Sequence, residues 1–133
     1  LRLHPPLVVF PRKLEKPAEL AGYSLPAGSR VAVVAHLLHR SADYWQSPEL
    51  FDPTRFSGER EEHKHHPGAY VPFGSGKHLC LGLNFAEMQV KLLVSKILTH
   101  FEWKCAPGYQ PRFSVPIQEP MDGLPLKLQR LPR

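Results

Sequence analysis

Apolar residues recur at intervals of three and four from Leu83 onward, at positions 83, 86, 90, 93, 94, 97 and 101. This spacing puts them on one face of an α-helix, which we expect to begin at Leu83 and to end near His100. Residues 101–105 follow as a predicted strand, in which Cys105 has a structural role. The second half of the chain is therefore predicted to contain one long helix.

The pattern elsewhere predicts short elements. Residues 1–4 are expected to form the last turn of a helix, which the pair Pro5 and Pro6 ends. Residues 18–25 and 29–35 are expected to pair as a hairpin through a type I turn at 25–28, with Pro and Gly at its second and fourth positions. The remaining predictions are an extended segment at 7–10, a short helix within 36–44, an irregular loop over 48–72, and short strands at 112–117 and 124–128.

Fifteen of the 133 residues are proline, which is roughly twice normal usage. Because proline removes a backbone donor, this composition favours loops, turns and short strands over helices. The sequence contains no secretion signal and no apolar run of membrane-spanning length. We therefore expect a cytoplasmic or membrane-associated protein that is not secreted.

The chain carries a formal net charge of +5. Its basic residues are scattered, with no run of five Lys or Arg and no interleaved aromatic residues, so a nucleic-acid partner is not expected. Its two cysteines, Cys80 and Cys105, stand far apart and form no CxxC pair. This spacing disfavours a disulfide framework and a zinc site.

Residues 73–82 read Phe-Gly-Ser-Gly-Lys-His-Leu-Cys-Leu-Gly and place Cys80 just before the predicted long helix. The helix dipole and the free N–H groups of a first turn favour the thiolate form of a cysteine. Glycines on both sides allow a large flat molecule to approach the backbone closely. A thiolate on an open face suits a soft axial metal ligand, whereas a lone cysteine is more often a small buried hydrophobe.

This segment resembles the heme-binding loop of cytochrome P-450, whose pattern is Phe-x-x-Gly-x-x-x-Cys-x-Gly. The resemblance implies that Cys80 is the proximal ligand of the heme iron, that Phe73 packs beside it, and that His78 contacts a heme propionate. The positions that match the family loop, and that we predict to bind the cofactor, are Phe73, Gly74, Gly76, His78, Cys80 and Gly82.

Two arginines resemble members of a buried ion-pair triad in the same family. Residues 1–6, Leu-Arg-Leu-His-Pro-Pro, are similar to the end of the Glu-x-x-Arg helix, so Arg2 corresponds to its arginine. Residues 51–56 are similar to the meander motif Pro-Glu-Arg-Phe, with Thr54 in place of the glutamate, and Arg55 corresponds to its arginine. The triad glutamate would lie two residues before Leu1. Taken without the resemblance, Arg2 is a surface residue at a helix end, and Arg55 is an exposed residue in a turn.

Further matches to the family concern a packing residue, a heme propionate and the substrate. Residues 39–45 resemble a His-Arg-Asp-Pro-x-x-Trp stretch, in which Trp45 is a packing residue. Arg12 stands where many members place a second propionate-binding arginine, although alone it is an ordinary strand-end charge. The resemblance makes residues 7–9, namely Leu7, Val8 and Val9, candidate substrate contacts, and the alternative is a plain core strand.

The resemblance implies that residues 1–133 are the C-terminal part of a single cytochrome P-450 domain. The expected fold class is an α+β fragment of that mainly α fold, with one long helix after the cysteine loop, short β hairpins and an irregular proline-rich meander. The implied cofactor is heme b, bound through Cys80. Its implied partners are a small apolar substrate and an electron-transfer protein (a ferredoxin, a flavodoxin or a reductase), which docks on a basic proximal face and relays electrons from NAD(P)H.

The implied reaction is oxygen insertion by a heme-dependent monooxygenase. We expect the 133 residues alone to be inactive and to hold no heme stably, because the distal acid-alcohol pair and the triad glutamate are missing from them. Two other classes stay open: a non-catalytic remnant or small heme-binding module that uses Cys80, and a basic interaction module in which Cys80 has no role.

Overall fold

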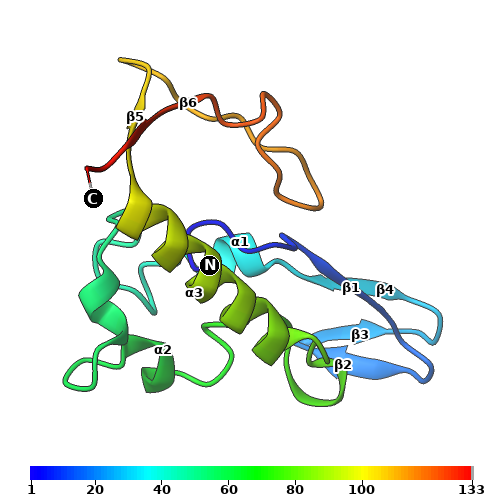
Figure 1. Ribbon diagram of the computed structural model, residues 1–133. Helices are drawn as coiled ribbons and strands as arrows, with labels where there is room; N and C mark the ends of the chain where they lie inside the picture. The colour runs from blue at the N-terminus through cyan, green and yellow to red at the C-terminus, as the bar shows by residue number, and fades with distance from the viewer. Residues whose placement is uncertain (133) are drawn as a thin grey trace.

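The computed structural model describes residues 1–132 and shows helix α3 running diagonally across a set of short strands and loops (Figure 1). Four strands and one helix come first: β1 (Phe10–Lys13), β2 (Ala18–Leu20), β3 (Tyr23–Leu25), β4 (Arg30–Val33) and α1 (Ala35–Leu38). The middle of the chain contains the 3-10 turn η1 (Pro53–Phe56), helix α2 (Glu62–His65) and the 3-10 turn η2 (Gly76–His78). Helix α3 (Leu83–His100) and strands β5 (Phe101–Cys105) and β6 (Leu126–Arg130) complete it.

The strands form three separate two-stranded antiparallel sheets, β1–β4, β2–β3 and β5–β6. The predicted hairpin partners were wrong, because β2 pairs with β3 and β4 pairs with β1. Residues 18–25 fold back on themselves since Ala21 and Gly22 both have positive φ, 50° and 81°. Two such residues make the type I′ turn that joins adjacent antiparallel strands.

The turn before β4 lies one residue later than predicted. The Ser29 N–H donates to the Pro26 carbonyl at 3.2 Å, and Gly28, the third residue of this turn, has a φ of 85°. Positive φ at that position is typical of a type II turn rather than type I. The predicted proline and glycine thus do mark a turn, with a different geometry.

The first four residues are not helical, which contradicts the prediction for them. A helix would need N–H donors from residues 5 and 6 for the carbonyls of Leu1 and Arg2, and proline has none. The Arg2 carbonyl instead accepts a hydrogen bond from His39, and the Leu3 carbonyl accepts one from Arg40. The side chains of His39 and Arg40, which follow α1, therefore supply the hydrogen bonds that these carbonyls would receive in a helix.

The long helix, the strand after it and the short helix near residue 36 are confirmed. The predicted strand at 112–117 is wrong: it makes only isolated bridges, Leu7 with Ile117 and Phe113 with Pro120. Prolines at 111 and 116 remove two ladder donors from this stretch. The last strand, β6, begins two residues later than predicted.

A small core lies between α1, the N-terminal segment and the irregular 48–72 segment. Its buried apolar residues are Ala35, Trp45, Ala69 and Val71. Three polar residues are buried with them: Arg2, His39 and Arg55. The Arg2 guanidinium lies 5.1 Å from the centroid of the Trp45 ring, a favourable cation–π contact. The core is thus unusually rich in cationic groups.

Helix α3 has no buried residue in the described part of the chain. One face exposes Val90, Leu93, Val94, Ile97 and Leu98, and another exposes Phe85, Met88 and Leu92. A helix that is apolar on several sides is typical of the interior of a larger protein. Over residues 1–132, no helix is long and apolar enough to span a membrane.

Candidate functional site

The cysteine loop, residues 73–82, is closed by a backbone hydrogen bond from the Cys80 N–H to the Phe73 carbonyl at 3.0 Å. Gly74 turns the chain with a φ of 78°, and a Cβ there would lie 2.9 Å from the His78 carbonyl oxygen. That separation is too short for any side chain, so the loop needs glycine at this position. The structure thus gives a steric reason for one of the glycines that the sequence singled out.

The Cys80 side chain is exposed at the N-terminal end of α3. Ala86 donates its N–H to the Gly82 carbonyl at 2.8 Å, which begins the helical hydrogen-bond pattern two residues after the cysteine. A Cβ on Gly82 would lie 3.8 Å from the sulfur atom. The neighbouring Leu81 is fully exposed and Leu79 is half exposed. The exposed thiol of Cys80 is thus flanked by two leucine side chains and by Gly82, which has no side chain.

The donors around this thiol indicate what kind of metal group fits. Among residues 1–132, no three His, Cys, Asp or Glu side chains come together as a metal site. One sulfur alone is too few ligands for a free ion. It suits an iron whose other ligands come from an organic macrocycle, with apolar surface for the ring to cover. The residues present therefore fit a heme.

The other predicted cofactor contacts lie on the loop or near it. His78 is exposed in η2, and Phe73 is half-buried. The ring of Phe10 in β1 comes within 3.9 Å of the Cβ position of Gly74, so β1 approaches the loop. Arg12 shares the half-buried face of β1 with Phe10, two residues along the strand. The roles of Arg12 and His78 toward propionates stay predictions.

The two predicted triad arginines are both buried, at 5% exposure for Arg2 and 2% for Arg55, which excludes the surface-charge interpretation of either. Arg2 donates to the carbonyls of His39, Pro48 and Leu50 and pairs with no carboxylate among residues 1–132. Burial, together with the nearby charge of Arg55, lowers the pKa of Arg2. A buried cation without a counterion is costly.

Arg55 is only partly satisfied by the described residues. It donates from Nη1 to the Glu62 carboxylate at 2.7 Å and from Nη2 to the Ser47 carbonyl at 2.9 Å. Its Nε is buried and has no partner among residues 1–132. The Nε of Arg55 thus lacks an acceptor among the described residues, and the nearby Arg2 guanidinium lacks a carboxylate there. A carboxylate between the two arginines, as in the predicted triad, would fill both positions.

Glu62 lies in the charged run 61–66, which was expected to be a solvated loop, and it joins this cluster to the surface. Its carboxylate also accepts from Arg60, which in turn pairs with Asp52 at 2.7 Å. Desolvation raises the pKa of Glu62, but the hydrogen bonds from Arg55 and Arg60 outweigh it, so the net pKa is lowered. Glu62 is therefore ionised and holds Arg55 in place.

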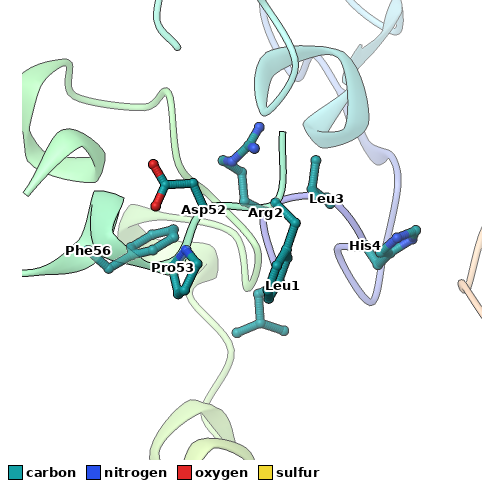
Figure 2. A pocket seen from close by; sticks show the side chains of 8 residues that line it. Leu1, Arg2, Leu3, His4, Asp52, Pro53 and Phe56 are labelled. Carbon is teal, nitrogen blue, oxygen red and sulfur yellow. The ribbon is translucent and has the colours of Figure 1, made fainter. Parts of the chain in front are cut away.

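A cavity of about 180 Å³ opens beside the start of the chain (Figure 2). Residues 1–4 line one side, and Asp52, Pro53 and Phe56 line the other. The cavity adjoins Arg2. It lies away from Cys80 and is not the cofactor site.

The sequence analysis did not predict a role for His39, although this residue begins the stretch 39–45 that contains Trp45. It is fully buried. One ring nitrogen bonds to the Arg2 carbonyl at 3.1 Å, and the other accepts the Val71 N–H at 2.9 Å. Burial lowers the pKa of His39 to about 4, against a weaker opposing effect of the Arg2 hydrogen bond.

The predicted substrate-lining residues Leu7, Val8 and Val9 are all half-buried. Val8 donates its N–H to the Pro116 carbonyl at 3.0 Å and accepts from the His36 N–H at 3.3 Å. This segment is thus held between α1 and the loop around residue 116. Both interpretations, substrate contact and core strand, fit this placement.

Comparisons with known proteins bear on the whole chain. The family model "Cytochrome P450" matches residues 1–126. "Putative cytochrome P450 136" of Mycobacterium tuberculosis (strain CDC 1551 / Oshkosh) is 38% identical over 133 aligned positions, which cover 97% of this chain and 27% of that protein. "Tabersonine 6,7-epoxidase isoform 1" of Catharanthus roseus is 38% identical over 111 residues, 84% of this chain and 22% of that protein.

Among solved structures, "Retinoic acid bound cyanobacterial CYP120A1" superimposes with a TM-score of 0.90 at 34% identity, covering 98% of this chain and 30% of that one. The chain therefore spans between a fifth and a third of the length of these relatives. Its short sheets and its long helix are part of a larger fold that these relatives contain. Because the family model covers nearly all of its residues, the chain belongs to the cytochrome P450 family.

Proposed function

We propose that the protein to which this chain belongs is a heme-dependent monooxygenase in which Cys80 is the axial ligand of the iron. The observation that carries the proposal is the exposed Cys80 thiol, held at the start of α3 by a loop with no room for a side chain at Gly74. When bound, heme supplies the oxygen chemistry: one atom of O₂ enters the substrate and the other leaves as water, with two electrons and two protons consumed.

The chain's own residues prepare the ligand. Cys80 stands two residues before Gly82, whose carbonyl accepts the first helical hydrogen bond of α3, and its thiol is exposed. As a ligand of a heme iron, its sulfur would donate electron density to the metal. Leu79 and Leu81, which are exposed in this structure, offer apolar surface to a flat ring. Arg12 would supply a cationic group, and His78 a ring nitrogen for hydrogen bonding, to the two propionates of heme b.

Residues 7–9 are proposed to line the substrate pocket with Leu7, Val8 and Val9. Aliphatic side chains select an apolar organic molecule. The names of two relatives agree with an organic substrate, since one is a tabersonine epoxidase and another has retinoic acid bound. The individual substrate of this protein does not follow from these residues.

Electrons are proposed to come from NAD(P)H through an electron-transfer protein, of the ferredoxin, flavodoxin or reductase type. The chain's net charge of +5 suits a basic docking face for an acidic partner. Lys91 of α3 lies 3.3 Å from Glu87 and is largely exposed, so it stays accessible to such a partner. We also propose a cytoplasmic or membrane-associated location.

We further propose that residues 1–133 are the C-terminal part of a single domain and are inactive alone. Two observations support this: α3 exposes apolar residues on two faces, and the Arg2–Arg55 cluster has an unfilled donor. The alternative is a remnant or a small module that binds heme through Cys80 without turnover. Heme titration of the isolated chain separates the two, since only the alternative predicts a stable thiolate-ligated spectrum.

The test of the main proposal compares Cys80→Ser with Cys105→Ser in the intact protein. Both cysteines are exposed, so the pair controls for loss of a surface thiol. We expect Cys80→Ser to lose thiolate-ligated heme and product formation, and Cys105→Ser to keep both. An unchanged heme spectrum and turnover in Cys80→Ser would refute the assignment of the iron ligand.

A further inference from the structure

We infer that His39 is a positioning residue for the cysteine loop, because its ring fixes the backbone of Val71 at the start of the chain that leads to Cys80. The inference rests on the proposed role of Cys80 as an iron ligand. It assigns to His39 a function in heme retention, beyond its contribution to the core. The structure supports it in three steps.

The first step is the form of the ring. The Arg2 carbonyl can only accept, so Nδ1 of His39 must carry the proton and donate it. The Val71 N–H can only donate, so Nε2 must present a lone pair. Both backbone partners are thus satisfied by one neutral tautomer and by no other form of the side chain.

The second step is the path from Val71 to the ligand. The Val71 carbonyl accepts the Gly74 N–H at 3.1 Å, and the Phe73 carbonyl accepts the Cys80 N–H at 3.0 Å. Val71 itself is buried. The bond from His39 therefore holds one end of a short hydrogen-bonded segment whose other end is the Cys80 backbone.

The third step is the anchoring of His39 itself. The Arg2 guanidinium donates to the His39 carbonyl at 2.7 Å while His39 donates to the Arg2 carbonyl, so the two residues hold each other reciprocally. The ring also stacks against Tyr70, with centroids 5.3 Å apart. His39 is thus fixed by the buried arginine cluster, and it links that cluster to the loop. An anchored support of this kind keeps a ligand in its productive position.

The two ring bonds can be separated by substitution in the intact protein. In His39→Asn, the amide NH₂ stands near the position of the ring Nδ1, so the variant keeps a donor for the Arg2 carbonyl but loses the acceptor for the Val71 N–H. One carbon further out, His39→Gln keeps an acceptor for Val71. A buried N–H that loses its acceptor costs enough to shift an equilibrium by roughly tenfold. We expect heme to dissociate about tenfold faster from His39→Asn than from His39→Gln.

The readout is the fraction of heme that keeps its thiolate ligand, taken from absorption spectra at a temperature at which circular dichroism shows both variants folded. His36→Asn is the matched control, because His36 lies on α1, the helix that His39 caps, and its ring hydrogen-bonds to Arg40 and Gln118, whereas the Val71 N–H is bound by His39. Equal retention of thiolate-ligated heme in the Asn and Gln variants would overturn the inference, since a general packing role affects both alike.

Two measurements on the unsubstituted protein decide the matter if either variant fails to fold. Nitrogen chemical shifts should show His39 neutral with its proton on Nδ1, and the Val71 amide should exchange with solvent as slowly as core amides. A doubly protonated ring, or a Val71 amide that exchanges as fast as a surface amide, would overturn the inference. If the protein holds heme without the Cys80 thiolate, the proposed function fails instead, and these two measurements still test His39.

Discussion

Replacing Glu62 by glutamine tests whether the buried Arg55 depends on the carboxylate of Glu62, beside the predicted triad glutamate. The Glu62 side chain is 13% exposed, and its partner Arg55 is 2% exposed, with 2.7 Å between the paired atoms. Glutamine keeps the size of the side chain and removes its charge. The adjacent Glu61 is the matched control, because it is 40% exposed and pairs with Lys64, which is 62% exposed.

The expected cost follows from what the substitution leaves behind. Removing one partner of a buried ion pair costs about 3–5 kcal/mol, since the other charge stays buried without compensation. Glutamine can still accept one hydrogen bond from Arg55, the Ser47 carbonyl remains in place, and the predicted triad glutamate of the intact protein would compensate part of the charge, so we expect a loss of about 2–3 kcal/mol. For Glu61→Gln we expect a loss of less than about 1 kcal/mol, as for other exposed pairs.

Urea unfolding of the intact protein at neutral pH, with each variant measured beside the unsubstituted protein, gives the free energy of unfolding directly. The signal should come from the heme absorption and from circular dichroism in parallel. If the two glutamine variants differ by less than about 0.5 kcal/mol, Glu62 does not hold a buried charge and the reasoning is refuted. Such small effects are typical of surface substitutions.

Two further predictions concern the same region. Burial lowers the pKa of His39 to about 4, whereas the unfolded residue binds a proton below about pH 6.5. Unfolding therefore takes up a proton between these values, so the free energy of unfolding should fall by about 3 kcal/mol as the pH drops from 6.5 to 4. Urea titrations across this range should show the slope in the unsubstituted protein and lose it in His39→Gln; an unchanged slope would contradict this account. Gly74→Ala should cost about 2 kcal/mol or more and release heme, because its Cβ would meet the His78 carbonyl at 2.9 Å. Gly22→Ala has a similar φ, and a Cβ there would meet nothing within 4 Å, so it should cost about 1 kcal/mol and leave the heme bound; equal effects of the two alanines would show that the contact with His78 does not matter.

The parts of this fold that the sequence predicted well are those that depend on neighbours along the chain. Helix α3 was predicted with both ends correct, because its apolar residues recur at helical spacing and a glycine precedes it. The cysteine loop was identified for the same reason, since its glycines and its thiol lie within ten residues.

The parts that the sequence could not predict depend on partners far along the chain. Strand β4 pairs with β1, some twenty residues away, and nothing in residues 18–25 announces that Ala21 takes a positive φ. The ring of His39 bonds to residues 37 and 32 positions away. The burial of Arg2 and Arg55 followed from the family resemblance and not from their local sequence, which suited an exposed charge equally well.

The unshielded faces of α3 have a consequence for the protein inside a cell. A polypeptide that ended up with these residues but without the segments that cover the helix would display a long apolar surface, and such surfaces promote aggregation. Chaperones and proteases act on species of this kind. An incomplete product would therefore be a target of cellular quality control while its Cys80 thiol is still exposed.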